Sequence, residues 1–399
     1  SGNERDVAKG ITTGVRALKE TLKRQAAAAS SSGGQQHQQF HHPQERIQVH
    51  VVTKIWYTYL GYARTKLAVE DILKDMQDAI QDPSVDLKIT LLLHWPRCYD
   101  NISWMECEKE EEQLPARVKQ AGPAPHLDKK NAWKESWKAL EDVYNSADYP
   151  AIAAIGVSNF EGADMRELLL PEKTTARTLP HVTQINVWHL ANNPDLVALY
   201  KNSGTHIQVY NVMNGIVGNI HDNTKAHHHL LMIANQLEEQ AAADVDNSGG
   251  DNLQVHASQV ILKWLVQSDF SIIPRTSNTD RLLDNSAVAL MKIPDMNEEQ
   301  LGIVRRCIVA LINNQDLKDD VLLKVRFHAK KEDMFVYWVS GDDGQEKQVG
   351  YVRAGDMLEQ STYPGHQFKV YHAQDPDQYQ SYAIRGKYGD PVQDIHVEL

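Results

Sequence analysis

The chain has 399 residues, of which 42% are hydrophobic, and carries a formal net charge of −12 at pH 7. This length suits one barrel-sized domain with a smaller companion. The acidic balance argues against general binding to nucleic acid or to an anionic membrane, and no run of about 18 apolar residues predicts a membrane-spanning helix. Three cysteines, Cys98, Cys107 and Cys307, have spacings that indicate neither a disulfide framework nor a zinc site, which suits a reducing, cytoplasmic compartment.

The first part of the chain predicts a helix followed by an insertion. Apolar residues recur at helical spacing over residues 3–24, from Val7 to Leu22. Residues 25–48 are rich in alanine, serine, glutamine and histidine. A segment of that composition cannot form a core, so we expect a disordered surface insertion there.

Short apolar runs then alternate with amphipathic segments. The runs predict strands at residues 49–56, 87–95, 151–157, 182–188, 206–213 and 271–275. Helices are predicted at residues 66–80, 131–144, 163–170, 194–201, 226–239, 257–267, 279–288 and 297–312. Strands of almost continuous apolar character, separated by helices, favour a parallel sheet covered on both faces. Residues 97–128 and 244–252 predict loop insertions in this pattern.

The pattern changes after a polar linker at residues 313–320. Short alternating runs with turn residues between them predict strands at residues 325–327, 335–339, 348–353, 367–372, 382–385 and 393–398. We therefore expect residues 321–399 to form a small antiparallel β-sandwich domain.

Polar or cationic residues stand at the ends of all six predicted barrel strands. They are Thr53-Lys54, His94, Ser158-Asn159, Gln184 with Asn186, Tyr210-Asn211, and Pro274-Arg275-Thr276. A single lysine or histidine at a strand end is usually a surface or structural residue. Because the carboxyl ends of parallel strands meet at one rim, their joint occurrence favours a shared functional site.

Four of these segments resemble the signatures of aldo-keto reductases, in the order found in that family. They are Thr53-Lys54-Ile55-Trp56, Leu93-His94-Trp95-Pro96, Ile155-Gly156-Val157-Ser158-Asn159-Phe160 and Ile273-Pro274-Arg275-Thr276. The resemblance covers residues 1–310. It implies an α/β fold, a TIM-type (β/α)8 barrel over residues 1–312, with six of the eight strands visible. The implied activity is NADPH-dependent reduction of aldehydes or ketones to alcohols by hydride transfer.

The resemblance also assigns catalytic roles. An unperturbed tyrosine, with a pKa of about 10, is a poor proton donor at pH 7. In the family a lysine beside the tyrosine favours the phenolate, an aspartate pairs with the lysine, and a histidine orients the carbonyl group. Lys54 matches the lysine and His94 matches the histidine.

For the cofactor NADP(H), the resemblance implies contacts of Ser158, Asn159 and Gln184 with the nicotinamide carboxamide and stacking of Tyr210 on the ring. The residues implied at the adenosine end, including its 2′-phosphate, are Arg275, Thr276, Arg281 and Asn285. Two arginines near the start of a predicted helix favour NADP over NAD. This sequence departs from the family pattern at Arg275, where lysine is more frequent, and at Asn186, where glutamate is usual.

The family's tyrosine precedes a Gly-Asn-Glu segment, and Ser1 stands at that position before Gly2-Asn3-Glu4. The aspartate has no counterpart. One interpretation is that about 40 upstream residues, a β/α unit and a further strand, precede Ser1. The alternative is a catalytically inactive relative that binds NADP(H) and serves as a binding or assembly module through its C-terminal domain. Without the tyrosine, we expect the chain that begins at Ser1 to reduce no aldehyde.

Residues 325–399 resemble the β-domain of the von Hippel–Lindau tumour suppressor. The resemblance rests on Tyr337-Trp338-Val339, Gly355 and the segment from Thr362 to Phe368. It places Thr362, His366 and Phe368 in the family's hydroxyproline-peptide pocket, which implies a peptide or protein partner there. Two of these three positions are substituted, and Val349 stands where the pocket has a tyrosine. The interpretation we favour is a small β-sandwich that packs on the barrel or aids assembly.

Two charged or metal-binding patterns are assigned structural roles. His227-His228-His229 are adjacent on a predicted helix and point in different directions, so we predict no metal site there. For the histidines of the insertion, His37, His41 and His42, we likewise predict no metal site. The acidic run at residues 106–112 is predicted to be a solvated loop, with shading of the active-site mouth as the alternative.

Overall fold

The computed structural model describes residues 2–31, 46–170, 176–244, 253–341, 343–386 and 392–398. The chain divides into two compact units. The first comprises Ser1–Ile185 with Asp195–Gln208, and the second comprises Asn186–Pro194 with Val209–Leu399.

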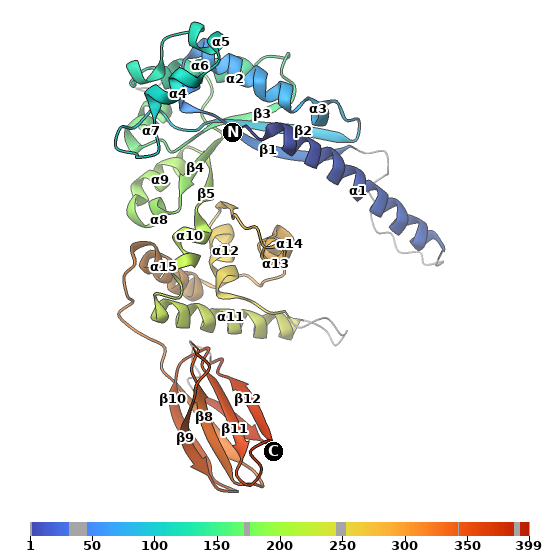
Figure 1. Ribbon diagram of the computed structural model, residues 1–399, viewed down its shortest axis with the longest axis vertical. Coiled ribbons are helices and arrows are strands. Elements are labelled where there is room, and N and C mark those ends of the chain that lie inside the picture. Colours follow the sequence, from blue (N-terminus) through green and yellow to red (C-terminus); the bar gives the residue numbers. More distant parts are fainter. Residues whose placement is uncertain are drawn as a thin grey trace. The chain divides into compact units, whose positions relative to one another are not determined.

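Six parallel strands form the larger sheet (Figure 1). They are β1 (Ile47–Ile55), β2 (Val85–Leu93), β3 (Ile152–Ser158), β4 (Val182–Asn186), β5 (His206–Tyr210) and β6 (Ser271–Ile273). Their order in the sheet is their order in the sequence. This is the connectivity that the barrel prediction requires for these strands, and over the described ranges the sheet begins at β1 and ends at β6.

The strands form where the sequence is apolar, but the expected cover on both faces is incomplete: no residue from Ile47 to Val52 of β1 is buried, and Val52 is 38% exposed. The last three residues of β2, Leu91, Leu92 and Leu93, are completely buried. Gly156 in β3 permits a close approach to the neighbouring strand. A Cβ atom at this position would overlap the carbonyl oxygen of Val182 in β4, so a larger residue would push the two strands apart.

Helices of the first unit pack against this sheet. They are α1 (Glu4–Ser31), α2 (Tyr62–Asp75), α3 (Gln77–Gln81), α6 (Ala132–Tyr144), α7 (Gly162–Leu169) and most of α9 (Pro194–Asn202), together with the short 3₁₀ helix η1 (Tyr57–Tyr59). In α6, Trp133, Trp137 and Leu140 are spaced to share one helix face, and all three are buried. The i, i+4 tryptophans are therefore part of the core.

Two predicted insertions differ from expectation. Helix α1 continues to Ser31, so the first residues of the 25–48 segment are helical, while residues 32–45 lie outside the described ranges. The 97–128 insertion contains α4 (Cys107–Gln113), α5 (Ala116–Gln120) and the 3₁₀ helix η2 (Pro125–Leu127). The prediction of a loop was wrong there because side chains of α4 find partners elsewhere in the first unit.

The second unit contains the remaining helices. They are α8 (Trp188–Asn192), α10 (Val212–Gly215), α11 (Thr224–Asp244), α12 (Ala257–Gln267), α13 (Thr279–Asp284), α14 (Ala287–Met291) and α15 (Glu298–Asn313), with the 3₁₀ helix η3 (Val217–Asn219). Helix α15 begins at a capping box in which Asn297 accepts from the N–H of Gln300 and the Gln300 side chain accepts from the N–H of Asn297. Its C-cap is Asn314, which is left-handed with φ of 50°.

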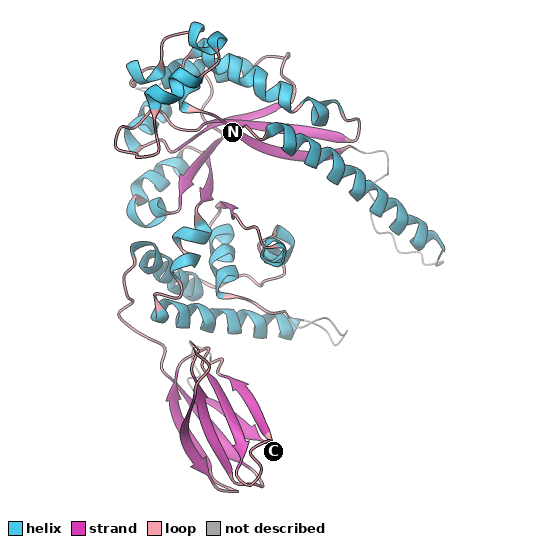
Figure 2. Cartoon of the chain, viewed as in Figure 1, coloured by secondary structure: helices cyan, strands magenta, loops and turns pink. Residues whose placement is uncertain are grey.

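The C-terminal strands form two small sheets (Figure 2). The strands are β7 (Leu323–Ala329), β8 (Met334–Val339), β9 (Glu346–Val352), β10 (Met357–Thr362), β11 (Gln367–His372), β12 (Tyr379–Ala383) and β13 (Val392–Val397). One sheet has the order β10-β7-β13 and the other β12-β11-β8-β9. Two predictions need correction. Strand β10 was not expected, and β13 pairs with β7 in parallel, so the domain is not wholly antiparallel.

Helix α11 supplies part of the core of these sheets. Met232 belongs to the same buried cluster as Phe327 and Phe368. Gly365 has φ of +87°, and a Cβ atom there would lie 2.8 Å from Leu231 of α11. Glycine is therefore favoured at this turn by its backbone conformation and by the closeness of the helix.

The predicted peptide-binding residues are buried or hydrogen-bonded to other residues of the domain. Phe368 is 2% exposed and Thr362 is 3% exposed. His366 lies 3.1 Å from the Thr362 hydroxyl through its Nδ1 atom, and Trp338 Nε1 lies 3.2 Å from the same nitrogen. The prediction of a partner at Thr362, His366 and Phe368 is therefore not supported, because these side chains pack within the domain.

The burial of Phe368 can be tested by stability. Phe368→Ala should lower the free energy of unfolding by about 3–5 kcal/mol, because it leaves a cavity beside Phe327. Met357→Ala is the control, since Met357 lies in the same domain and is half exposed. Chemical denaturation monitored by circular dichroism would measure both changes. An unaltered midpoint for Phe368→Ala would contradict the core assignment.

Candidate functional site

Lys54 and His94 lie at the ends of two adjacent parallel strands. Lys54 is in β1, and His94 follows the last residue of β2. Ile55 is paired with Leu93, and the His94 N–H donates to the Ile55 carbonyl at 3.0 Å. This register places the lysine and the histidine at the same edge of the sheet.

Burial changes the proton affinity of both side chains. It lowers the pKa of Lys54 below its usual value. The pKa of His94 falls to about 3, chiefly because of burial and secondly because of the neighbouring Lys54 cation. His94 is therefore a neutral imidazole at pH 7. A neutral imidazole can donate one N–H to a carbonyl oxygen without adding a second charge beside Lys54.

Aromatic rings surround His94. The centroids of Trp56 and His94 are 4.9 Å apart with the rings edge to face, and Trp95 lies 6.4 Å from His94. Trp104, from the 97–128 insertion, lies 6.1 Å from Trp56 and 5.9 Å from Trp95. We call Trp56, Trp95 and Trp104 the tryptophan wall.

Helix α4 is held to this region by two consecutive glutamates. Trp56 Nε1 donates to Glu110 Oε2 at 2.7 Å, and the Tyr57 hydroxyl also donates to Glu110. Glu111 accepts from Nη1 and Nη2 of buried Arg64 at 2.8 and 2.7 Å. The run is therefore helical from Cys107, with Glu106, Glu108 and Glu112 exposed as predicted and Glu110 and Glu111 paired with other segments. Its sequence gave no sign of which glutamates would find partners.

Cys98 and Cys107 form a disulfide bond, with their Cα atoms 6.3 Å apart. Cys307 is free and buried. This pairing is not predicted from the sequence. The separation of two cysteines along the chain does not show whether the loop between them brings their sulfur atoms together. The bond closes the segment that carries Trp104.

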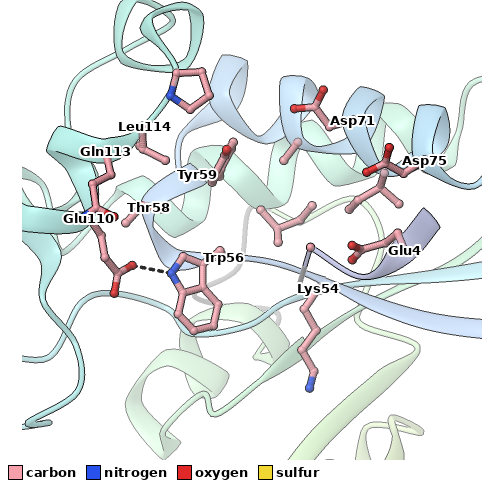
Figure 3. A pocket seen from close by; sticks show the side chains of 15 residues that line it. Glu4, Lys54, Trp56, Thr58, Tyr59, Asp71, Asp75, Glu110, Gln113 and Leu114 are labelled. Atoms are coloured by element: carbon pink, nitrogen blue, oxygen red, sulfur yellow. Dashed lines mark hydrogen bonds between the residues drawn. The ribbon is translucent and has the colours of Figure 1, made fainter. Parts of the chain in front are cut away.

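A cavity of about 620 Å³ adjoins the end of β1 (Figure 3). Its lining includes Glu4, Lys54, Asp71, Asp75 and Glu110. Figure 3 shows the Lys54 side chain directed away from Asp71 and Asp75. The acidic wall of the cavity and the Lys54 ammonium thus face in different directions, so the cavity does not by itself define the site of Lys54 chemistry.

The next two strand ends bring further polar groups to His94. Asn159 is left-handed with φ of 57°, and its Nδ2 donates to the His94 carbonyl at 3.0 Å and to the Ser158 hydroxyl at 3.1 Å. Its backbone N–H donates to the carbonyl of Gln184 at 3.2 Å. The first unit therefore brings together the predicted residues Lys54, His94, Ser158, Asn159 and Gln184.

Gln184 has one unsatisfied polar atom. Its Nε2 donates to Gln208 Oε1 at 2.9 Å, whereas its buried Oε1 has no hydrogen-bond partner in the described part of the chain. Buried acceptors are normally paired, so an unpaired one suits an external donor such as a carboxamide NH₂.

The other predicted cofactor residues belong to the second unit. Burial raises the pKa of Tyr210, and a hydrogen bond with Asn186 partly opposes that increase. Tyr210 thus lies beside Asn186, one of the two positions at which the sequence departs from the family pattern.

The remaining four lie close together in sequence, around α13. Arg275 and Arg281 are exposed. The Thr276 hydroxyl accepts from the N–H of Asn278 at 3.1 Å, and Asn278 Oδ1 accepts from the N–H of Arg281 at 3.0 Å. Asn285 is buried, and its Nδ2 has no partner within the described ranges.

The three consecutive histidines of α11, for which no metal site was predicted, have other contacts. His228 Nδ1 lies 3.0 Å from Asp320 Oδ1, and its ring stacks on Tyr363. His227 lies against His221, and burial lowers its pKa to about 4. Over the described ranges, no three His, Cys, Asp or Glu side chains are grouped so that they could hold a metal ion. Nor does any helix in those ranges have the length and apolar character needed to cross a membrane.

The class of protein that these features indicate, a parallel β/α sheet with a lysine and a neutral histidine at adjacent strand ends, is an oxidoreductase. Residues 24–308 match the model of the aldo/keto reductase family. The chain belongs to that family, and the predicted membership is confirmed. The matched residues end before the C-terminal β-domain, for which the von Hippel–Lindau resemblance stays a prediction.

Curated relatives share low identity over most of this region. The NAD(P)H-dependent D-xylose reductase of Kluyveromyces lactis is 25% identical, over 71% of this chain and 71% of its own length. The glyoxal reductase of Bacillus subtilis is 23% identical, over 61% of this chain and 63% of its own length. Among solved structures, aldose reductase from Giardia lamblia is similar with a TM-score of 0.43 and 19% identity, covering 68% of this chain and 74% of that one.

The neutrality of His94 gives a pH prediction. Between about pH 5 and pH 8, where an ordinary histidine titrates, the ¹⁵N shifts of the His94 ring should stay constant because its pKa is about 3. Lys54→Met should raise that pKa, since it removes a nearby positive charge that disfavours the imidazolium. NMR titration would measure both. A midpoint near that of a free imidazole in the unaltered protein would show that His94 is not shielded as described.

Proposed function

We propose that the protein reduces aldehyde or ketone groups of small molecules to alcohols with NADPH. The observation that carries this proposal is the pair of Lys54 and neutral His94 at adjacent strand ends, joined through Asn159 to the polar groups of the next strands. The relatives named above are reductases, which supports the same chemistry. They do not favour the alternative of an inactive binding or assembly module.

Each residue has a distinct proposed task. The neutral imidazole of His94 donates a hydrogen bond to the carbonyl oxygen of the substrate and orients it. The Lys54 cation stabilises the phenolate of the tyrosine that serves as general acid in the family, and so brings its pKa toward neutrality. Bound NADPH supplies the hydride.

The residues available fit NADP(H). The unpaired Oε1 of Gln184 is an acceptor for an amide NH₂, and the unpaired Nδ2 of Asn285 is a donor for a ring nitrogen. Ser158 and Asn159 are proposed to assist Gln184, and Tyr210 to stack on the nicotinamide. Arg275, Thr276 and Arg281 are proposed to hold the 2′-phosphate, which a guanidinium can bind through two parallel hydrogen bonds.

We also propose that residues 1–312 form the reductase domain and residues 321–399 a packing domain, with 313–320 as the linker. The last helix ends at Asn313 and the first C-terminal strand begins at Leu323, which supports this division. A cytoplasmic location remains part of the proposal.

Cofactor preference tests the adenosine end. Arg281→Ala should weaken NADPH binding about 10-fold or more, because a charge-assisted hydrogen bond to the 2′-phosphate is lost. NADH binding should be almost unchanged. Arg305→Ala, an exposed arginine of α15, is the matched control. Fluorescence titration with each cofactor would measure the dissociation constants, and equal losses for NADPH and NADH would refute the assignment.

Catalysis tests the role of Lys54. In a form of the protein that supplies the tyrosine, Lys54→Met should lower the rate of aldehyde reduction about 10²–10⁴-fold, because the general acid loses the cation that lowers its pKa. NADPH binding should be retained, since Lys54 is not assigned to the phosphates. Lys88→Met, in the neighbouring strand β2, is the control. Rates would be followed by NADPH absorbance. Undiminished reduction by Lys54→Met would overturn the proposed mechanism.

A further inference from the structure

We infer that the C-terminal domain binds a neutral, extended chain of β-linked sugar rings on the outer face of the sheet β12-β11-β8-β9. These strands belong to the second unit of the chain, whereas Lys54 and His94 belong to the first. The inference therefore concerns a separate binding site and goes beyond the proposed reduction of carbonyl groups.

The outer face of this sheet carries one aromatic side chain from each strand in a continuous row (Figure 1). Tyr371 of β11 pairs with Tyr379 of β12 on one side and with Phe335 of β8 on the other. Phe335 in turn pairs with Tyr351 of β9. Residues paired directly across neighbouring strands point to the same face of a sheet, and the alternate positions, such as Val370, face the buried core. We call Tyr379, Tyr371, Phe335 and Tyr351 the aromatic row.

The two ends of the aromatic row are open to solvent. Tyr379 is 50% exposed and Tyr351 is 46% exposed. The ring centroids of Tyr371 and Tyr379 are 5.1 Å apart, as are those of Phe335 and Tyr351. Neighbouring strands lie about 4.8 Å apart, so the row extends about 14 Å across the sheet. Contiguous exposed aromatic surface marks a binding site more often than single exposed rings do.

The polar groups around the aromatic row favour a ligand that donates hydrogen bonds. The Tyr371 hydroxyl donates to Glu346 Oε2 at 2.8 Å, and the Tyr351 hydroxyl donates to Asp333. The Lys369 ammonium is paired with Glu346 at 2.6 Å. The phenol protons are thus already held by carboxylates, whereas each carboxylate oxygen has a second lone pair with which it can accept. A ligand rich in O–H groups suits these acceptors.

A sugar ring combines the two properties that this face requires. A pyranose with equatorial hydroxyls presents C–H groups on its faces and O–H groups around its rim. The negative face of an aromatic ring attracts polarised C–H groups, and the rim hydroxyls can donate to carboxylates such as Glu346 and Asp333. Because the aromatic row crosses several strands, an extended chain of sugar rings can contact more than one aromatic ring at a time.

Two other polymers that stack on aromatic rings fit this face less well. A single-stranded nucleic acid needs cations along its phosphates, but Lys369 is neutralised by Glu346 and the chain has a net charge of −12. A proline-rich peptide needs hydrogen-bond donors for its solvated backbone carbonyls. The hydroxyls of Tyr351 and Tyr371 already donate to carboxylates. The observations therefore favour the sugar chain over both polymers.

The first experiment measures binding to the whole chain by isothermal titration calorimetry. The probe is methyl β-cellohexaoside, a soluble chain of β-linked glucose whose blocked end cannot open to an aldehyde. Oligothymidylate and poly-L-proline are the comparison ligands. We expect binding of the glucoside and none of the other two. Absence of binding by the glucoside, or tighter binding of either comparison ligand, would overturn the inference.

Variants at the two ends of the aromatic row test where the sugar chain binds. Tyr379→Ala and Tyr351→Ala should each weaken the glucoside roughly 3- to 10-fold, because one aromatic contact is lost. Tyr379→Phe should retain most of the affinity, since it keeps the ring. Tyr62→Ala, at an exposed tyrosine of the first unit, is the matched control and should leave the affinity unchanged. Circular dichroism would verify that each variant is folded. Undiminished affinity in both alanine variants of the row would refute this site.

The inference and the proposed function can fail separately. Glucoside binding requires neither cofactor nor turnover, whereas NADPH oxidation with propanal measures the reductase activity. Tyr379→Ala should leave the rate of propanal reduction unchanged, because Tyr379 has no assigned part in catalysis. If propanal is reduced but the glucoside does not bind, the inference is wrong and the reductase function stands. If the glucoside binds through the aromatic row but no aldehyde is reduced, the proposed function fails and the sugar site stands.

Discussion

The parallel pairing of β1 with β2 is the constraint on which the site depends. It brings Lys54 and His94 to one edge and joins them through the hydrogen bond from the His94 N–H to the Ile55 carbonyl. Burial chiefly, and secondly the Lys54 cation, lowers the pKa of His94 to about 3, so the imidazole is neutral at pH 7. The neutral histidine beside a lysine is thus a consequence of register and burial. The same edge continues through Asn159 to Gln184, so polar groups accumulate where the strands end.

A second constraint is the buried guanidinium of Arg64. An unpaired buried charge is very costly, and Arg64 is satisfied by Glu111 together with the carbonyls of Thr58 and Gly122. These partners come from η1, α4 and the end of the insertion, so a single side chain fixes three segments. Glu110 is adjacent to Glu111. The ion pair that holds Glu111 therefore also positions Glu110 to accept hydrogen bonds from Trp56 and Tyr57. The insertion is consequently part of the site's structure.

The sequence predicted the strands and helices of the barrel region well, because apolar strand segments alternate there with amphipathic helical ones. Strand ends were overestimated where apolar residues such as Trp56 continue beyond the last ladder hydrogen bond. Edge strand β10 was missed because its exposed face is polar, and the parallel pairing of β13 has no local signal. In the site, Lys54 and His94 could be identified from their positions at strand ends. Trp104, Glu110 and the Cys98–Cys107 bond could not, since a loop's partners depend on tertiary contacts that spacing does not record.

One end of the C-terminal domain packs against α11, which belongs to the same unit of the chain. Its turn at Tyr363 and Gly365 meets α11 through His228 and Leu231, and Met232 completes its core. Asp320, just before β7, contacts His228, while Arg385, near β12, pairs with Glu238, six residues before the last residue of α11. These contacts bury the end of the domain at which a peptide pocket was expected. His228 and His229 of α11 thus contact Asp320 and Asp319 of the segment before β7, whereas His227 lies against His221.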